Sequence, residues 1–571
     1  PRDYTDGERG SYFKLRSSVA DADTQYKLGF TGAYQFDNLG AVLEYTHREF
    51  EEQDVNGPGS LNPQDGDSDA LLLKTVWDIS EDQSLTLILD EYTEDNITVL
   101  ESDLGSSVSR SIGHDETDRI GFGADYRWES NAFIADEIQL ALKYQQTDGL
   151  QNTVQDRTSY SFLNPRDPST YSGTAAVRVT DFEFNQDTFA LNVNLWKSFD
   201  AGETTHSIAY GLNFDETDTE RPRNRCDQAV STNTRTCQIS AYPFAPSEDF
   251  PNKTFPDSNT KRFGIYVQDE IAIANTRLTV IPGYRYDRYD MRPELDGLVD
   301  ASSILEEFGG FKVTDIEEDA SSLSLGVIYD LSERITVFSQ YAEGYRPPNF
   351  DEANQAFINL GYGYATIPNP HLEAETSKGA EVGVRANLGN AFISLVTFHN
   401  RYSNFIESAF SGQQDGISLF QDRNIGSVEI EGAEVSSNWY LSDQWRLRAS
   451  LAYIKGDNQT ADLPLDSVDP LTAVVGLRYD NSLQNWGGEV IVTAVDKKDR
   501  VSSADVVSAD SYLTTDLIAF YKLNDSAMLR FGAFNLFDEE YARWTNLSGL
   551  PVTNIEAIEN SFQPGFNFRL G

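Results

Sequence analysis

The chain has 571 residues, 12% of them aromatic, and 91 acidic against 44 basic side chains give it a formal net charge of -47. This charge excludes nucleic acid as a partner, because phosphate backbones are bound by basic surfaces. The chain contains no run of about 18 apolar residues, which excludes transmembrane helices. A mean hydropathy of -0.45 in so aromatic a chain suits strands that face two different solvents.

Alternation with a period of two predicts strands along the chain. In residues 24–36 the even positions are mostly apolar or aromatic and the odd positions mostly polar, and residues 277–287 and 445–453 repeat the pattern. Such segments indicate strands with one apolar face and one polar face. Acidic residues gather between them, as in residues 65–69, where the ligand spacing and the closing Glu of a calcium loop are missing. We therefore favour solubility over bridging divalent cations as the role of these acidic segments.

The connections between the predicted strands alternate in length. Short turns of Asp, Asn, Gly and Ser are predicted at residues 37–40, 80–83, 200–203, 332–334, 389–390, 442–443 and 524–526. Long polar loops are predicted near residues 51–67, 94–115, 148–176, 218–260, 291–316, 346–375, 406–425, 457–469, 498–510 and 541–563. Strict alternation of short and long connections is typical of an outer-membrane barrel, with turns on the periplasmic side and loops outside.

Counting strands across these connections predicts an all-β fold: a 22-stranded antiparallel transmembrane outer-membrane β-barrel, forming a single domain over residues 1–571. The first strand occupies residues 11–20 and the twenty-second begins near Phe566, and bacterial barrels require such an even number. The last strand is shorter than a bilayer crossing, so we expect it to be truncated. Because no signal peptide precedes Pro1, we expect a mature or excised piece.

The two cysteines, Cys226 and Cys237, lie in one polar loop. Their spacing is too long for a CxxC redox motif, and no His shares the segment to complete a zinc site. We expect a disulfide, which stabilises the loop by about 3 kcal/mol in the chain-entropy model. A disulfide places this loop in an oxidising compartment such as the periplasm or the cell surface.

The loop at residues 346–375 carries the most informative motifs. Tyr345-Arg346-Pro347-Pro348 ends a strand, because proline cannot donate to a strand ladder, and Asn369-Pro370-His371-Leu372-Glu373-Ala374-Glu375 leads into the next strand. These two boxes resemble the paired Phe-Arg-Ala-Pro and Asn-Pro-Asn-Leu boxes of TonB-dependent outer-membrane receptors, and of their haem and haemoglobin branch especially. Asn535-Leu536-Phe537 resembles the penultimate-strand motif of that superfamily, and residues 253–271 and 564–570 resemble two further signatures.

This resemblance implies an active importer in the outer-membrane lipid. A barrel of this width holds a plug, and in the family the plug precedes the barrel, so we expect it to lie before Pro1 and to contact the TonB complex. The resemblance implies haem or a haemoprotein as the ligand, with a ferric siderophore as the alternative. Haem would then be cargo, and no resident cofactor is expected.

The candidate ligand contacts lie in the same loop and are His371, Tyr362, Tyr364 and Arg346. Haem receptors usually place a ligand His between the two boxes, but this chain has no His from Arg346 to Pro370. His371 lies within the second box, and Tyr362 and Tyr364 lie between the boxes, where a phenolate can hold ferric haem iron. For each residue the alternative is structural: His371 as a turn residue, and the two tyrosines as loop packing.

The sequence carries none of the common signatures of an enzyme or a metal centre. It has no nucleophile elbow, no HExxH, no phosphate-binding glycine loop and no clustered Cys. We therefore expect neither catalysis nor a metal site. An outer-membrane barrel enzyme and a passive porin are the alternatives from other classes. Barrel enzymes are usually far smaller, and a porin would not carry the paired boxes.

Overall fold

The computed structural model describes residues 10–105, 107–130, 132–157, 175–239, 248–296, 298, 312–359, 364–414 and 416–571. One sheet of 28 strands contains the wall of the molecule. Of these strands, 22 form a closed antiparallel barrel in which the last strand pairs with the first. The predicted fold class is confirmed.

The barrel strands are, in chain order, β1 (Ser11–Ala20), β2 (Gln25–Phe36), β3 (Leu39–Glu51), β4 (Gln64–Ser80), β5 (Gln83–Val99), β6 (Val108–Glu129), β7 (Glu137–Arg157), β8 (Ala176–Ala201), β9 (Thr204–Glu220), β15 (Asp257–Ile273), β16 (Leu278–Glu294), β17 (Ile316–Ser332), β18 (Ile335–Arg346), β21 (Glu375–Asn387), β22 (Ala391–Gln414), β23 (Ile417–Tyr440), β24 (Trp445–Asn458), β26 (Thr472–Asp480), β27 (Trp486–Val495), β28 (Tyr512–Asn524), β29 (Ala527–Phe534) and β30 (Asn567–Leu570). Short strands in the connections are β10 (Pro222–Ala229), β11 (Arg235–Thr236), β12 (Gln238–Ile239), β13 (Glu248–Asp249), β14 (Asn252–Lys253), β19 (Phe357–Asn359), β20 (Tyr364–Thr366) and β25 (Leu463–Pro464). The helices are η1 (Glu101–Asp103), α2 (Phe350–Asn354), α3 (Trp544–Leu547) and α4 (Ile555–Glu559).

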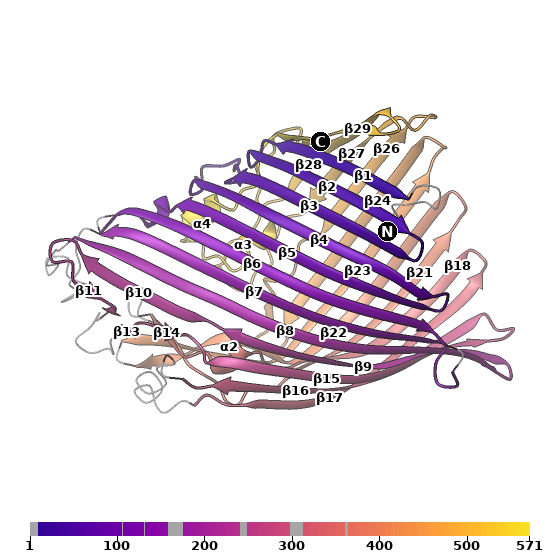
Figure 1. The fold of residues 1–571 in the computed structure, drawn as a ribbon, viewed down its shortest axis with the longest axis horizontal. Helices are drawn as coiled ribbons and strands as arrows, with labels where there is room; N and C mark the ends of the chain where they lie inside the picture. The colour runs from indigo at the N-terminus through magenta and orange to yellow at the C-terminus, as the bar shows by residue number, and fades with distance from the viewer. Residues whose placement is uncertain are drawn as a thin grey trace.

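Figure 1 shows the strands running obliquely around the wall, with α2, α3, α4 and β10 gathered at one end, which we call the mouth. The helices of the described segments have at most 5 residues, and none of them is long or apolar enough to span a membrane.

The predicted turns are confirmed, whereas three of the predicted loops are partly strand. All seven short turns fall between consecutive barrel strands. At residues 94–115, however, β5 continues to Val99 and β6 begins at Val108, and at residues 406–425 β22 and β23 form one long hairpin. In residues 148–176, β7 continues to Arg157, and residues 158–174 lie outside the described residues. The reason is that strands beyond an apolar wall have water on both faces, so they lose the alternation of hydrophobicity while keeping the hydrogen-bonded ladder. Residues 65–69, expected between strands, likewise lie within β4.

The outer face of the wall is apolar and the inner face polar. Register places Leu73, Leu89, Phe122, Tyr144 and Phe189 side by side on five consecutive strands from β4 to β8, and most of this row is exposed. The opposite face carries polar residues of the other parity, as in the hydrogen bond between the hydroxyls of Thr188 and Thr217. This arrangement is typical of a barrel that faces lipid outside and water inside.

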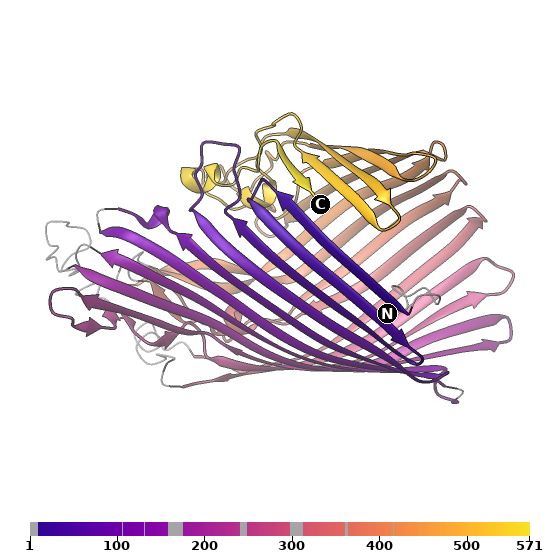
Figure 2. The same ribbon diagram turned by 45° about the horizontal axis from the view of Figure 1, so that its top comes forward.

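The barrel closes where its two ends meet. β30 pairs with β1 through Val19↔Leu570 and Ala20↔Arg569. The Asp21 carboxylate accepts a hydrogen bond from the Phe568 N–H at 2.6 Å, and the Asp21 N–H donates to the Phe568 carbonyl at 3.2 Å. Figure 2 shows the yellow C-terminal strand beside the indigo strands of the N-terminus.

Candidate functional site

The connection from β18 to β21 packs against the inner wall of the mouth. Its helix α2 begins with a capping box in which the Asn349 side chain accepts the Glu352 N–H and the Glu352 carboxylate accepts the Asn349 N–H. The helix packs the buried Ala353 against Met291 of β16. Met291 lies on the inner face of this strand, because Tyr284, which points outward, has the other parity. The apolar cluster comprises Tyr289, Met291, Ile316, Ala353, Leu372 and Ile406, with Phe350 packed against it.

Arg346 joins three segments of the mouth through its guanidinium group. Nε and Nη2 donate to the two Glu375 oxygens at 2.7 and 2.6 Å, and Nη1 donates to both Glu352 oxygens at 2.9 and 3.0 Å. Glu375 is 8% exposed and also accepts the Ile406 N–H at 2.7 Å. Burial raises the pKa of Glu375, but the hydrogen bonds from Arg346 and Ile406 and the charge of Arg346 outweigh burial, so the net pKa is lowered. This geometry gives Arg346 a role in the framework of the loop.

Asn354 connects α2 to the segment that precedes β17. Its side chain is fully buried; Oδ1 accepts the Thr314 N–H at 2.9 Å and Nδ2 donates to the Thr314 carbonyl at 3.0 Å. We expect Asn354→Leu to lower the free energy of local opening of α2 by about 2 kcal/mol, because Thr314 loses both partners. Hydrogen exchange of the Ala353 amide should then quicken about 30-fold, while the amide of Leu388, in a distant turn, keeps its rate. An unchanged Ala353 rate would contradict this role.

The second box ties the loop to the long hairpin of β22 and β23. The Asn369 N–H donates to the Ala353 carbonyl at 3.0 Å, and its Nδ2 donates to the Asp422 carbonyl at 2.8 Å. β20 pairs in parallel with β23 from Tyr364↔Ser418 to Thr366↔Phe420. The two boxes therefore hold one unit, made of α2, β20 and the extended hairpin.

The structure does not assemble the predicted ligand residues into one site. His371 is exposed, and its backbone N–H donates to Asn369 Oδ1 at 3.1 Å. The Tyr364 ring meets Phe357 and Phe420 edge-on, with centroids 6.1 Å apart in both pairs. Tyr362 lies outside the described residues. Within those residues, no hydrogen bond, ion pair or ring contact joins His371 to Tyr364 or Arg346.

The other motif residues have structural positions. Pro348 is fully buried, next to Pro347 at the end of β18, and the hydroxyl of Tyr345 is buried without a partner. Asn535 is 3% exposed and has a positive φ of 47°, and its amide exchanges hydrogen bonds with the Glu539 backbone at 2.8 and 2.9 Å. It thereby turns the chain out of β29, where the Leu536 N–H donates to the Thr515 carbonyl at 2.8 Å. Phe537, in contrast, is 75% exposed.

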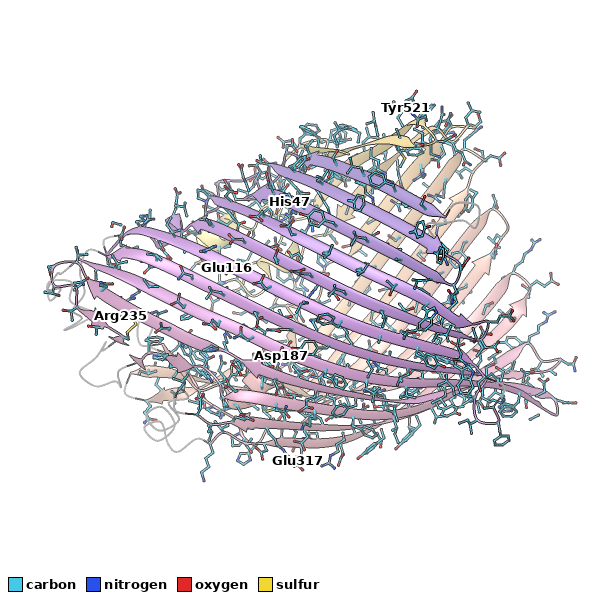
Figure 3. The ribbon with its side chains drawn as sticks, in the orientation of Figure 1. His47, Glu116, Asp187, Arg235, Glu317 and Tyr521 are labelled. Atoms are coloured by element: carbon cyan, nitrogen blue, oxygen red, sulfur yellow. A yellow bond between two sulfur atoms is a disulfide. The ribbon has the colours of Figure 1, made fainter. Side chains whose placement is uncertain are left out.

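A disulfide joins Cys226 to Cys237, whose Cα atoms lie 4.1 Å apart. It holds β10 and β11 together at the mouth, beside Arg235, whose Nη2 donates to Cys226 Sγ at 3.3 Å (Figure 3). β10 also extends the barrel sheet by pairing with β8 from Arg223↔Phe182 to Ala229↔Ala176.

A group of arginines beside this disulfide was not predicted from the sequence. We call it the arginine cluster, and it comprises Arg157, Arg178, Arg223 and Arg225. Arg178 donates to both Asp227 oxygens at 2.7 and 2.9 Å, and Arg223 lies 4.4 Å above the Phe182 ring. A signal was present in the segment Arg221-Pro222-Arg223-Asn224-Arg225, where every second residue is an arginine in an otherwise acidic chain.

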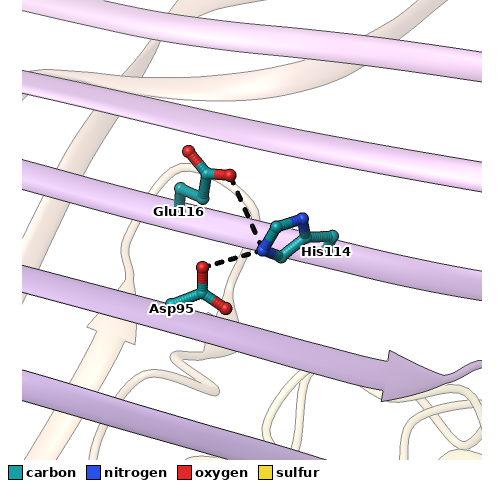
Figure 4. Close-up of side chains that lie close together, drawn as sticks. All are labelled: Asp95, His114 and Glu116. Carbon is teal, nitrogen blue, oxygen red and sulfur yellow. Dashed lines mark hydrogen bonds and ion pairs between the residues drawn. The ribbon is translucent and has the colours of Figure 1, made fainter.

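One group of His and carboxylates in the described ranges has the spacing of metal ligands, although no metal site was predicted. Asp95, His114 and Glu116 place their ligand atoms within 4.8 Å of one another (Figure 4). His114 Nε2 lies 2.8 Å from Asp95 Oδ2 and 3.6 Å from Glu116 Oε1. A protonated His114 satisfies both contacts as ion pairs, so this geometry by itself does not require a metal.

This chain is similar in sequence to one protein-family model and to proteins named for hemoglobin. The family model described as "TonB dependent receptor-like, beta-barrel" matches residues 64–536. A hemoglobin and hemoglobin-haptoglobin-binding protein of Haemophilus ducreyi is 25% identical over 489 residues, covering 68% of this chain and 50% of that protein. Hemoglobin-haptoglobin utilization protein B of Neisseria meningitidis is 24% identical over 282 residues, covering 43% of this chain and 35% of that protein. The chain thus spans at most about half the length of these relatives.

Solved structures share the fold. The copper transporter OprC superposes with a TM-score of 0.71 at 16% identity, covering 98% of this chain and 80% of that one. The Serratia marcescens hemophore receptor HasR, in complex with its hemophore HasA and heme, gives a TM-score of 0.70 at 16% identity, covering 100% and 81%. The ferric enterobactin receptor PfeA of Pseudomonas aeruginosa gives 0.69 at 17%, covering 98% and 80%. The matched family model and the closed barrel show that the chain belongs to the TonB-dependent receptor family and forms the β-barrel of such a receptor.

Proposed function

We propose that this barrel belongs to an outer-membrane receptor of a Gram-negative bacterium that captures haem, free or bound to a haemoprotein, and imports it into the periplasm. The observation that carries the proposal is the similarity over 489 residues to a protein named for binding hemoglobin and hemoglobin-haptoglobin. The lumen of so wide a barrel needs a plug, through which the TonB complex would transmit energy. The protein acts as a transporter, and haem is its cargo.

The mouth contains a loop and an exposed histidine that are suited to holding a haem ligand above the lumen. The loop of the two boxes packs against the inner wall through Met291 and Leu372, so a ligand held there lies above the lumen. His371 is exposed and is our candidate for an iron ligand in the loop, because a neutral imidazole coordinates haem iron. Tyr364 is a weaker candidate, since its ring packs against Phe357 and Phe420.

A haemin titration of the full-length protein, followed at the Soret band, tests the proposal. We expect saturable binding of haemin and competition by haemoglobin. His371→Ala should weaken binding about 10-fold or change the Soret position, whereas Tyr364→Phe should leave both unchanged. Absence of saturable binding of haemin and haemoglobin would overturn the haem assignment. Saturable binding of a ferric siderophore instead would establish the alternative ligand. The fold of this chain is also similar to that of the ferric enterobactin receptor PfeA.

A further inference from the structure

The turn between β6 and β7 exposes an apolar tip. Phe133 is 96% exposed and Ile134 is 58% exposed, and the value for Phe133 is the largest among the large apolar side chains of the described residues. The turn lies between Glu129 of β6 and Glu137 of β7, at the end of the wall away from the mouth (Figure 1). The seven predicted turns at this end are mostly polar, so the apolar tip is an exception that contact with water does not explain. Exposed apolar patches of this kind mark interaction or membrane sites.

Side chains of β8 and β9 hold this turn in place. Lys197 Nζ donates to the Asp136 carboxylate at 2.5 Å and to the Ala132 carbonyl at 3.3 Å. The Tyr210 hydroxyl donates to the Ile134 carbonyl. These contacts fix the backbone on both sides of Phe133 against the wall, so the apolar tip has a defined position.

Both residues that hold the turn lie on the outer face of the wall. Lys197 and Leu195 have the parity of Phe189 on β8, and Phe189 belongs to the outward row of apolar side chains described above. Leu195 pairs with Tyr210 on β9, so Tyr210 points outward as well. Leu195, Tyr210 and Ile265 line an apolar groove on this face with a volume of about 420 Å³. The turn therefore lies over the outer surface, at the edge of this groove.

The apolar outer face extends to both sides of the turn. Trp128, which has the parity of the outward Phe122, precedes the turn on β6 and is 38% exposed. β8 continues past Lys197 to Ala201, and on this stretch Phe199 points outward and is 42% exposed. Such a mixture of aromatic and long basic side chains is typical of the interface between lipid and water. An apolar side chain that projects from the wall at this level meets the same solvent as the wall itself.

We propose that the β6–β7 turn is a lipid-contact site, in which Phe133 and Ile134 insert among the acyl chains of the phospholipid leaflet that surrounds the end of the barrel away from the mouth. Under the proposed function, on which this inference rests, that leaflet is the periplasmic leaflet of the outer membrane. Phospholipid is the occupant because the surface beneath the turn is continuous with the lipid-facing wall. The groove beside Tyr210 offers room for an acyl chain next to the inserted tip.

Spin labelling of the full-length protein in vesicles of phosphatidylethanolamine and phosphatidylglycerol tests this contact. Both native cysteines are joined in the disulfide, so Phe133→Cys supplies a single free thiol for the label. We expect the label to collide often with oxygen, which concentrates in lipid, and rarely with the water-soluble complex Ni(II)-EDDA. Leu142→Cys, on the outward face of β7, is the lipid control. Asp443→Cys, in an exposed polar turn at the same end of the barrel, is the water control.

The two controls separate failure of the contact from failure of the membrane setting. A label at residue 133 that behaves as at residue 142 supports the contact. A label at residue 133 that meets Ni(II)-EDDA as often as at residue 443 overturns the inference and leaves the proposed function intact. A label shielded from both reagents also overturns it, because protein would then cover the turn. If the label at residue 142 itself behaves as in water, the wall does not face lipid, and the membrane setting of the proposed function fails together with the inference.

Discussion

Glu375→Ala is expected to raise the rate at which hydrogen peroxide oxidises Met291 by about 30- to 150-fold. Met291 is fully buried beneath α2, so the oxidant reaches it only when the loop between the two boxes, residues 346–375, opens. Removing Glu375 leaves Arg346 with Glu352 alone and leaves the Ile406 N–H without its acceptor. Breaking a buried ion pair costs about 3 to 5 kcal/mol, and we expect about 2 to 3 kcal/mol because the Arg346 side chain is 44% exposed.

Mass spectrometry of methionine sulfoxide measures this rate with an internal reference. The chain contains 2 methionines, and the second, Met528, is exposed at 39%, so its rate should be unchanged in the variant. Glu381→Ala, on the same strand β21, is the matched control and should leave Met291 protected. If Met291 in Glu375→Ala is oxidised no faster than in wild type, the ion pair does not hold the loop.

The ion pair between Arg346 and Glu375 predicts that the rate of Met291 oxidation depends on pH. The pKa of Glu375 is lowered in the folded protein, so its stabilising contribution is fully present above the ordinary value of 4.5 and is lost as the pH falls through the lower folded value. Met291 oxidation in wild type should therefore quicken only at acid pH, and the variant should not show this step. A step of equal size in Glu375→Ala would assign it to another group.

Breaking the disulfide by Cys226→Ser/Cys237→Ser is expected to quicken amide exchange around β10 and β11 by about 100-fold. The disulfide closes a segment with a sequence separation of 11, and in the chain-entropy model such a bond stabilises by about 3 kcal/mol. The amides to follow are those of Ala229, bonded to the Thr234 carbonyl at 2.9 Å, and Phe250, bonded to the Cys237 carbonyl at 2.8 Å.

The control for this measurement is the turn between β21 and β22, on the opposite end of the wall. There the Leu388 N–H donates to the Ala391 carbonyl at 2.8 Å, and its exchange should not change. Unchanged exchange of Ala229 and Phe250 would mean that the β10–β8 pairing alone holds the segment. A uniform increase, including Leu388, would instead indicate that the variant loosens the whole barrel.

Sequence alone determined the wall of the barrel, because its information is local. An apolar face opposite a polar face imposes a period of two on each strand, and turns such as residues 37–40 and 389–390 are encoded by their own short sequences. Counting these signals was enough to reach 22 strands. The pairing of Cys226 with Cys237 also followed from sequence, since no other cysteine exists.

Only the tertiary structure decided what the mouth looks like. Beyond the apolar wall both faces of a strand meet water, so the hairpin of β22 and β23 had the composition of a loop, and pairing between the two strands made it sheet. The boxes could be found by motif, but Arg346 and Glu375 are 29 residues apart, and their contact depends on β18 lying beside β21. The arginine cluster draws on β7, β8 and β10, so its charge is dispersed along the chain and becomes a single feature only when cross-strand register brings the three strands together.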